Sequence, residues 1–289
     1  MRALVIGDTM LDVYVYGKVH RVAFEAQCPV FQGVASKCHL GAATNVAANL
    51  RRYGLDVDLV SLIGDDEVGV LVEKLCDERG IVMFCSFRGG QRLRERFCET
   101  VTGHQIFRCD YDPPDYMQPE EAVNLIHDAV EKRIRYDAVV ISDYGYSVVS
   151  QKVLDALQPK SYGLLAIDIS ERNADKLTGT MDLAIVNGRI SHKVSMETKE
   201  RIVTHGASGL DYYRDGFRLF HLSATSGHPI CTVGAGDSVL AAAVYAKLKG
   251  LDGAAMAGFA NKQAGKLVGE HGTCCPTEPL TEVTDDNQG

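Results

Sequence analysis

The chain has 289 residues, 46% of them hydrophobic, and a formal net charge of −8. This length and apolar content are enough to bury a sizeable core, either as two small domains or as one large α/β domain, and we expect one domain with an appendage. The acidic balance argues against nucleic acid or an acidic membrane surface as a partner, because binding to a phosphate backbone needs a broad basic field.

Short apolar runs that end in polar residues recur along the chain and are typical of buried strands in a parallel sheet. They cover residues 3–8, 138–145 and 164–168. Amphipathic segments alternate with these runs, and we expect helices over residues 68–79 and 119–133. The alternation predicts an α/β fold, whose ligands bind at the C-terminal ends of the strands, where Asp8, Asp143 and Asp168 lie.

A small β lid is predicted from segments that are rich in β-forming residues but too short and too polar at their edges to be core strands. Two of them cover residues 13–19 and 29–34, and an arginine-rich segment follows at residues 88–110. In a strand, Arg92, Arg94 and Arg96 point to one face and can converge on a dianion. The same run is also compatible with a solvated face that binds nothing.

A helix is predicted to begin near Gly41, since small residues stand at its start and Val46, Ala47 and Leu50 have the spacing of a buried face. Asn45 lies close to this start and can both donate and accept hydrogen bonds to neighbouring hydroxyls. A packed helix start without a ligand is the alternative interpretation.

Near the C-terminus, Gly234, Ala235, Gly236 and Asp237 precede an apolar run that is typical of a buried helix. The two glycines let backbone amides crowd together at the helix start, which favours an anion. Asp237 falls in the first turn, where a carboxylate can accept a proton from a hydroxyl while the amides neutralise charge on a transferring phosphoryl group. This combination suits phosphoryl transfer to an alcohol, and a simple helix cap is the alternative.

The stretch Gly234 to Asp237 resembles the signature of the ribokinase-like (phosphofructokinase-B) carbohydrate kinases. Its place about fifty residues before the C-terminus, with Ala260-Asn261 and Gly272-Thr273 after it, is similar to that family as well. The resemblance extends over nearly the whole chain. It implies a three-layer α/β sandwich with a mostly parallel central sheet, a single kinase domain over residues 1–289, and a β lid from about 12–36 and 87–110.

The same resemblance implies roles for particular residues. Asp237 becomes the catalytic base, and the amides of Gly234, Ala235 and Gly236 become the anion hole. ATP is the implied phosphoryl donor, and Mg²⁺ comes with the nucleotide without a metal site of protein side chains. The expected nucleotide contacts, which include a turn similar to the Thr-x-Gly-x-x-Gly turn of the family, are Asn187, Thr204, Gly206, Gly209, Asn261 and Gly272.

Residues 7–12 and 21–30 look more specifically like the kinase half of ADP-heptose synthesis enzymes, which phosphorylate O1 of a heptose 7-phosphate. A heptose 7-phosphate-like acceptor is therefore expected, and so is a homodimer, because lid strands pair between subunits in such kinases. The expected contacts to the sugar hydroxyls come from Asp12, Gly41, Asn45 and Asp143. The expected contacts to the sugar phosphate come from Arg94, Arg96 and Arg108.

Several positions depart from the family pattern, mostly on the nucleotide side. Tyr146 and Ser170 stand where the family has lysines, and Ile190 stands where a glutamate helps to organise magnesium through water. The helix expected between Asn187 and Thr204 is missing from the sequence. We therefore expect weakened binding of Mg-ATP. A catalytically weak homologue that binds sugar phosphate or nucleotide remains the alternative, and a nucleoside acceptor is disfavoured because the lid arginines would lack an anion.

The expected cellular location follows from three features: the cysteines, the histidines and the apolar runs. The nine cysteines include no CxxC pair, and the histidines lack ligand spacing, which argues against a disulfide framework or a zinc site. No apolar run approaches the roughly 18 residues of a membrane span, and no leader is recognisable at the N-terminus. We expect a cytoplasmic protein with reduced thiols.

Overall fold

The computed structural model describes residues 1–114, 117–132, 135–157, 162–225 and 232–268. Nine strands of the described residues form the main sheet: β1 (Arg2–Gly7), β4 (Asp56–Ile63), β5 (Ile81–Phe87), β8 (Ala138–Ser142), β9 (Leu165–Asp168), β10 (Thr180–Asn187), β11 (Glu197–Thr204), β12 (Leu210–Arg214) and β13 (Phe217–Leu222). Their order is β13-β12-β11-β10-β9-β8-β1-β4-β5. The pairs from β5 to β11 are parallel, and β12 and β13 add an antiparallel edge.

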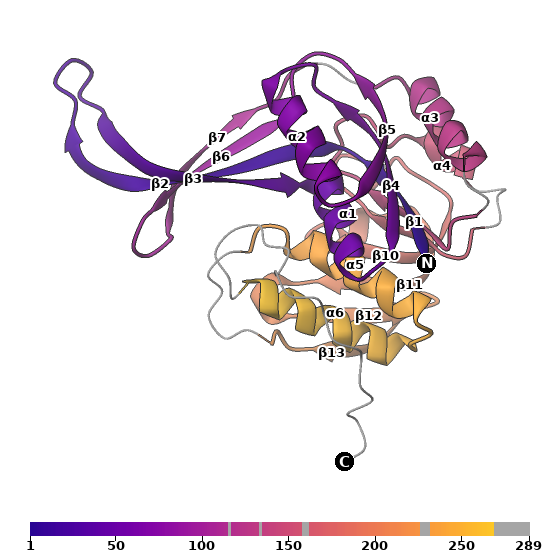
Figure 1. Ribbon diagram of the computed structural model, residues 1–289. Helices are drawn as coiled ribbons and strands as arrows, with labels where there is room; N and C mark the ends of the chain where they lie inside the picture. The colour runs from indigo at the N-terminus through magenta and orange to yellow at the C-terminus, as the bar shows by residue number, and fades with distance from the viewer. Residues whose placement is uncertain (115–116, 133–134, 158–161, 226–231, 269–289) are drawn as a thin grey trace.

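Helices cover both faces of this sheet (Figure 1). One buried cluster joins the sheet to α1 (Ala42–Arg52), α2 (Glu67–Asp77), α5 (Ala235–Leu248) and α6 (Gly253–Val268), and a second joins it to α3 (Pro119–Glu131) and α4 (Gln151–Leu157). Strand β1 contributes Ala3 and Val5 to the first cluster and Leu4 and Ile6 to the second. This alternation follows from the two-residue period of a strand. The predicted three-layer α/β sandwich is confirmed.

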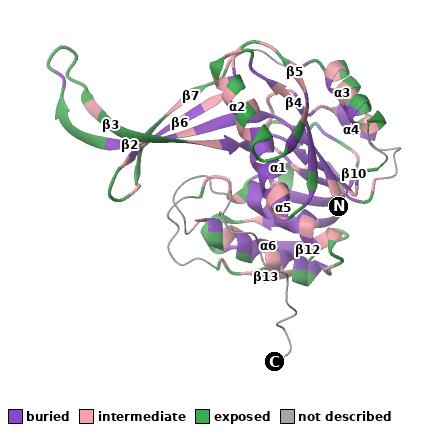
Figure 2. Ribbon diagram, in the orientation of Figure 1, coloured by how far each residue is buried: buried purple, intermediate pink, exposed green. Residues whose placement is uncertain are grey.

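A second sheet of four strands extends from the body in the order β3-β2-β6-β7. Its strands are β2 (Thr9–Val22), β3 (Pro29–Gly41), β6 (Leu93–Glu99) and β7 (Gln105–Tyr111). In Figure 1 the β2–β3 hairpin reaches far beyond the body, and in Figure 2 its outer part is exposed. The expectation of short strands was wrong here, because β2 and β3 have 14 and 13 residues. Residue 87 belongs to β5 in the main sheet, so the second lid segment begins later than expected.

The connection from β10 to β11 is unusually short for two parallel neighbours, which are normally joined through an α-helix. Residues 188–196 contain only a 3₁₀ turn at Ser191–Lys193, as the missing helix in the sequence predicted. Ile190 is 4% exposed and packs in the second cluster near Val186 and Met196. The structure thus places Ile190 in the core.

Among the described helices, none combines the length and the apolar character that crossing a membrane requires.

Candidate active site

The start of α5 has the geometry of an anion site. Gly234 caps the helix with φ of 79°, a left-handed conformation that strains any residue with a Cβ. Asp237 lies in the first turn and is 3% exposed. The amides of Gly236 and Asp237 lie in the same turn, where helical N–H groups have no acceptor within the helix and the macrodipole is positive. The amide of Ala235, one of the three amides predicted for the anion hole, bonds the carbonyl oxygen of Thr232 at 3.3 Å, and the anion hole stays a prediction.

Asp237 is held by side chains from two distant parts of the chain. Asn45 of α1 donates from Nδ2 to its Oδ2 at 2.8 Å, and the Tyr144 hydroxyl donates to its Oδ1 at 2.9 Å. Asn49 donates to the amide oxygen of Asn45 at 3.2 Å, which turns the Asn45 amine toward the carboxylate. Three elements thus fix both oxygens of Asp237 at the C-terminal edge of the main sheet, as expected for this fold.

Burial dominates the electrostatics of Asp237. It raises the pKa of the carboxyl from 3.8 to about 7, although the hydrogen bonds from Asn45 and Tyr144 oppose this shift. A base works best when its pKa lies near the working pH, since it is then ionised and still accepts a proton readily. A carboxyl with this pKa suits general-base chemistry near neutral pH.

Asp168 is a second carboxylate beside the α5 start. Its Oδ2 lies 3.4 Å from the point that a Cβ on Gly236 would occupy. Burial, followed by repulsion from Asp237 and Asp143, holds the pKa of Asp168 well above its ordinary value. A cation or a proton near Asp168 would relieve this repulsion.

Two buried carboxylates fix the loop after β8. Asp8 accepts hydrogen bonds from the amides of Tyr146 at 3.0 Å and of Tyr144 and Val148 at 3.2 Å, and burial raises its pKa to about 6. Asp143 accepts from the amide of Gly145 and from both the amide and the hydroxyl of Ser170. These bonds give Asp143 a structural task, and its predicted contact with a sugar stays a prediction.

The predicted sugar residues of the lid meet one another. Asp12 pairs with Arg96 at 2.7 Å, and both are buried. A Cβ on Gly41 would lie 2.5 Å from Asp12 Oδ2, so the glycine makes room for this carboxylate. Arg94 turns instead to Asp112 at 2.7 Å, and Arg108 pairs with Asp110 at 2.7 Å. Arg94 and Arg96 lie on one face of β6, as predicted, and their shortest ion pairs go to different carboxylates, whereas Arg92 precedes the strand.

A pocket of about 420 Å³ opens beside the α5 start. It collects most of the predicted nucleotide contacts, together with Ala235 and Gly236, from strands, loops and α6: Asn187, Thr204, Gly206, Gly209 and Asn261. A Cβ on Gly209, whose φ is 95°, would lie 2.0 Å from the carbonyl oxygen of Leu222, so only glycine fits there. Gly272 lies outside the described residues.

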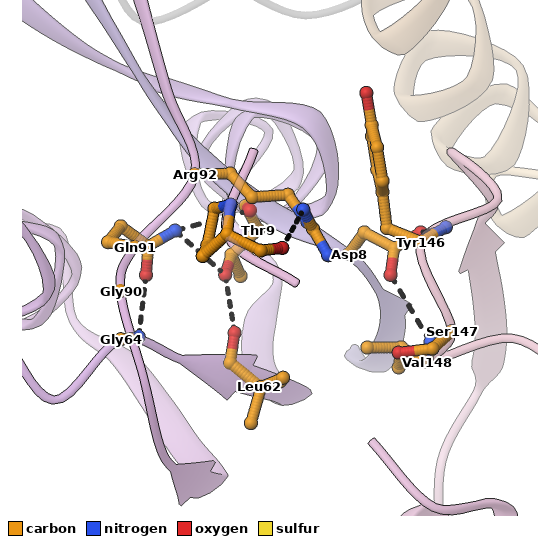
Figure 3. Close-up of a pocket in the computed structure, with 11 residues that line it drawn as sticks. Asp8, Thr9, Leu62, Gly64, Gly90, Gln91, Arg92, Tyr146, Ser147 and Val148 are labelled. Carbon is orange, nitrogen blue, oxygen red and sulfur yellow. Dashed lines mark hydrogen bonds between the residues drawn. The ribbon is translucent and has the colours of Figure 1, made fainter. Parts of the chain in front are cut away.

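Sequence reasoning gave no role to Tyr144, Asn49 or Arg172. Tyr144 follows a predicted strand directly, and a hydroxyl at that edge was the available signal. Figure 3 shows a further small pocket where the lid meets the body, with Asp8, Arg92 and Tyr146 around it. Arg172 contacts the Tyr146 ring from the other side of this loop. No local sequence pattern marks the contact of Arg172 with Tyr146.

A buried carboxylate at a helix start, beside a pocket of this size, is the arrangement that a phosphotransferase acting on alcohols requires. The model of the pfkB family of carbohydrate kinases matches residues 2–158 and 119–279. The chain belongs to this family.

Similar proteins agree with this class. The chain is 30% identical over 301 residues to a D-beta-D-heptose 7-phosphate kinase of Bordetella bronchiseptica, with 96% of this chain and 93% of the relative covered. It is 27% identical over 306 residues to the bifunctional protein HldE of a Nitratiruptor species, covering 98% of this chain and 64% of the relative. The chain thus spans less than two thirds of such bifunctional relatives.

Solved structures show the same fold. Phosphofructokinase-2 from Escherichia coli, solved with potassium, superposes with a TM-score of 0.76 at 17% identity over 94% of each chain. Arabidopsis thaliana ribokinase superposes with a TM-score of 0.69 at 16% identity, covering 94% of this chain and 93% of the ribokinase.

Proposed function

We propose that the chain transfers the γ-phosphoryl group of ATP to a hydroxyl of a phosphorylated sugar, and that the acceptor is O1 of a heptose 7-phosphate-like molecule. The observation that carries this proposal is Asp237, a buried carboxylate with a pKa near 7 in the first turn of α5. The relative named as a heptose 7-phosphate kinase supports the acceptor. The cytoplasm is the proposed location, because ATP is available there and the free thiols found among the described cysteines persist there.

In the proposed reaction, Asp237 accepts the proton of the sugar hydroxyl as its oxygen attacks the γ-phosphorus. The bond between this phosphorus and the oxygen bridging to the β-phosphate breaks, and ADP leaves. The amides at the start of α5 stabilise charge on the transferring group. Asn45 and Tyr144 hold the Asp237 carboxylate in position for the hydroxyl.

ATP would occupy the pocket lined by Asn187, Thr204 and Asn261. Among the described residues, no group of three or more His, Cys, Asp or Glu side chains could hold a metal directly. Mg²⁺ keeps several waters when it binds through phosphates, which suits such a site. Asp168, with its raised pKa beside Gly236, is the side chain that would face those waters. The ion would neutralise charge on the phosphates.

A coupled assay of ADP release tests the proposal over a panel of phosphorylated and unphosphorylated sugars. We expect turnover with a heptose 7-phosphate, and at most slow turnover with the same sugar lacking its phosphate. Binding of sugar phosphate or ATP without ADP release would instead support a homologue that only binds.

The pH dependence of the rate should report the raised pKa of Asp237. The protonated carboxyl cannot accept a proton, so kcat/KM for the sugar should fall about tenfold per unit as the pH drops below about 7. Asn45→Ala removes a hydrogen bond that favours the charged form, and this raises the pKa further. The acid limb should therefore move to higher pH, and Tyr144→Phe should move it in the same direction. A limb at the ordinary aspartate value would contradict this assignment.

A homodimer through the lid is also proposed. One face of the lid carries an aromatic cluster of Phe31, Phe97 and Phe107, in which Phe97 and Phe107 stack with centroids 4.3 Å apart. Phe107 remains 42% exposed, and Val34 on β3 is 66% exposed. Exposed apolar surface of this kind is typical of an interaction site. A sheet of only a few strands cannot bury its apolar face by itself. A second copy of the lid is the proposed partner.

Sedimentation should show a dimer at micromolar concentration. Phe107→Asp places a charge in the aromatic cluster and should shift the protein to monomer. Val70→Asp is the matched control, because Val70 is 62% exposed on α2, outside the lid strands, and should leave the dimer intact. A wild-type protein that sediments only as monomer would count against the lid interface.

A further inference from the structure

Three arginine side chains surround the ring of Tyr146 where the lid meets the body. The Cζ atoms of Arg92, Arg172 and Arg94 lie 4.1, 5.1 and 5.9 Å from the ring centroid, within the range of cation–π contact. Arg94 also donates to the Tyr146 hydroxyl at 2.7 Å. The lid supplies Arg92 and Arg94, and loops after β8 and β9 supply Tyr146 and Arg172. We call these four residues the Tyr146 cluster.

In the described part of the chain, Arg92 and Arg94 of the Tyr146 cluster share two carboxylates. Arg94 lies 2.7 Å from Asp112 and 3.5 Å from Asp110, and Arg92 lies 3.6 Å from the same Asp112. Asp110 is shared with a further arginine, Arg108, at 2.7 Å. Arg172 donates to a backbone carbonyl, that of Gly145 at 3.3 Å. Among the residues that the structure describes, Asp110 and Asp112 are thus shared by three arginines, and Arg172 contacts a carbonyl oxygen. This concentration of guanidinium groups suits a phosphate dianion.

The cluster is built on a loop that is already fixed in place. Asp8 accepts hydrogen bonds from the amides of Tyr144 and Tyr146. Figure 3 draws Asp8 and Tyr146 in the small pocket. Such fixed groups lose little entropy when a ligand binds. The same loop brings Tyr144 to Asp237, and two steps along the chain span at most about 7 Å. The loop thus places the Tyr146 cluster two residues from a partner of Asp237, as a ligand with both a hydroxyl and an anionic group would require.

We propose that the Tyr146 cluster binds the phosphate group of the phosphorylated sugar, an assignment that rests on the proposed function. Tyr146 itself has no charge, but its ring holds Arg92 and Arg172 and its hydroxyl holds Arg94. Arginine forks suit phosphate because they donate two parallel hydrogen bonds. The sequence indicated Arg94, Arg96 and Arg108 for this role. Our proposal keeps Arg94 and takes Arg92 and Arg172 in place of Arg96 and Arg108, which pair with Asp12 and Asp110.

A phosphate at this place could in principle belong to the sugar or to ATP. The described residues around the pocket proposed for ATP include none of Arg92, Arg94 and Arg172. Two of these three arginines come from the lid, which also holds Asp12. These observations favour the phosphate of the sugar, and kinetics can separate the two sources.

The test measures KM and kcat for heptose 7-phosphate and for ATP in Arg92→Gln and Arg172→Gln. We expect the KM for the sugar phosphate to rise about tenfold or more in each variant, because each variant loses charge-assisted hydrogen bonds that contribute to binding. The kcat and the KM for ATP should stay within about twofold of wild type. Tyr146→Phe keeps the ring and should have a smaller effect than Tyr146→Leu. Arg135→Gln is the matched control, because Arg135 is exposed before β8, at the opposite sheet edge, and should change nothing.

Calorimetry with heptose 7-phosphate and with the same sugar lacking its phosphate completes the test. The wild type should bind the phosphorylated sugar more tightly, and Arg172→Gln should reduce the difference between the two affinities. Thermal unfolding should show that this variant is folded, since Arg172 is exposed. An unchanged preference, or a rise in the ATP KM alone, would overturn the assignment even if the kinase reaction occurs. Arg172-dependent binding without any turnover would uphold the cluster and reject the proposed function.

Discussion

Asp237→Asn is expected to keep the fold and the sugar site but to lose at least about 100-fold in kcat, because the amide keeps the shape and cannot accept a proton. Asn45 and Tyr144 now donate to the carboxylate, and Tyr144 can still donate to the amide oxygen of the variant. The measurement is the initial rate of sugar-dependent ADP release at saturating substrates. Calorimetry of sugar phosphate binding should show at most a small change.

The stability of this variant provides its control. Burial raises the pKa of Asp237 from 3.8 to about 7, so this group stabilises the fold only where it is protonated, and that contribution is lost as the pH rises through about 7. The neutral amide avoids this loss, and the thermal midpoint of Asp237→Asn above pH 7 should equal or exceed that of the wild type. A stable variant with near-normal turnover would remove Asp237 from the mechanism.

Ile190→Glu is expected to destabilise the fold and not to improve magnesium binding. Ile190 is 4% exposed in the cluster below the short β10–β11 connection, so the substitution buries a charge without a built partner. Changes of this kind lower the free energy of unfolding by about 4 kcal/mol or more. In a chain this long, such a loss lowers the thermal midpoint by roughly 10 °C. Thermal unfolding by circular dichroism measures the effect.

Ile190→Val is the control, since it removes one methylene and should cost only about 1 kcal/mol. If the glutamate variant were as stable as wild type and bound Mg-ATP more tightly, the side chain would have to face the nucleotide, and the position of Ile190 in the structure would be wrong.

The sequence predicted the body of the fold because its strands are buried on both faces and appear as continuous apolar runs, such as residues 3–8 and 138–142. The lid was harder to predict. The outer halves of β2 and β3 are exposed, so no burial pattern marks their length, and only their pairing with each other extends them. The length of the hairpin depends on the pairing of both strands, so the sequence of either strand alone does not predict it.

Some parts of the candidate site could likewise be predicted from the sequence, and others could not. The α5 start could be predicted because glycines and a carboxylate at a helix N-terminus form a local chemical pattern. The arginine run could be placed on a strand face but not assigned to partners, since Arg96 binds Asp12 of β2 and Arg94 binds Asp112 beyond β7. Tyr146 likewise looked like the loss of a lysine, and only the fold shows the arginines around its ring.

The most direct test of a kinase that uses Asp237 on a phosphorylated sugar is a ³¹P NMR spectrum of the wild-type protein with ATP, Mg²⁺ and heptose 7-phosphate. We predict that a second sugar phosphate ester, coupled to the anomeric proton, appears in equal amount to ADP, and that Asp237→Asn forms little of it in the same time. Consumption of ATP to ADP and inorganic phosphate without a new ester, or no consumption at all, would contradict this account.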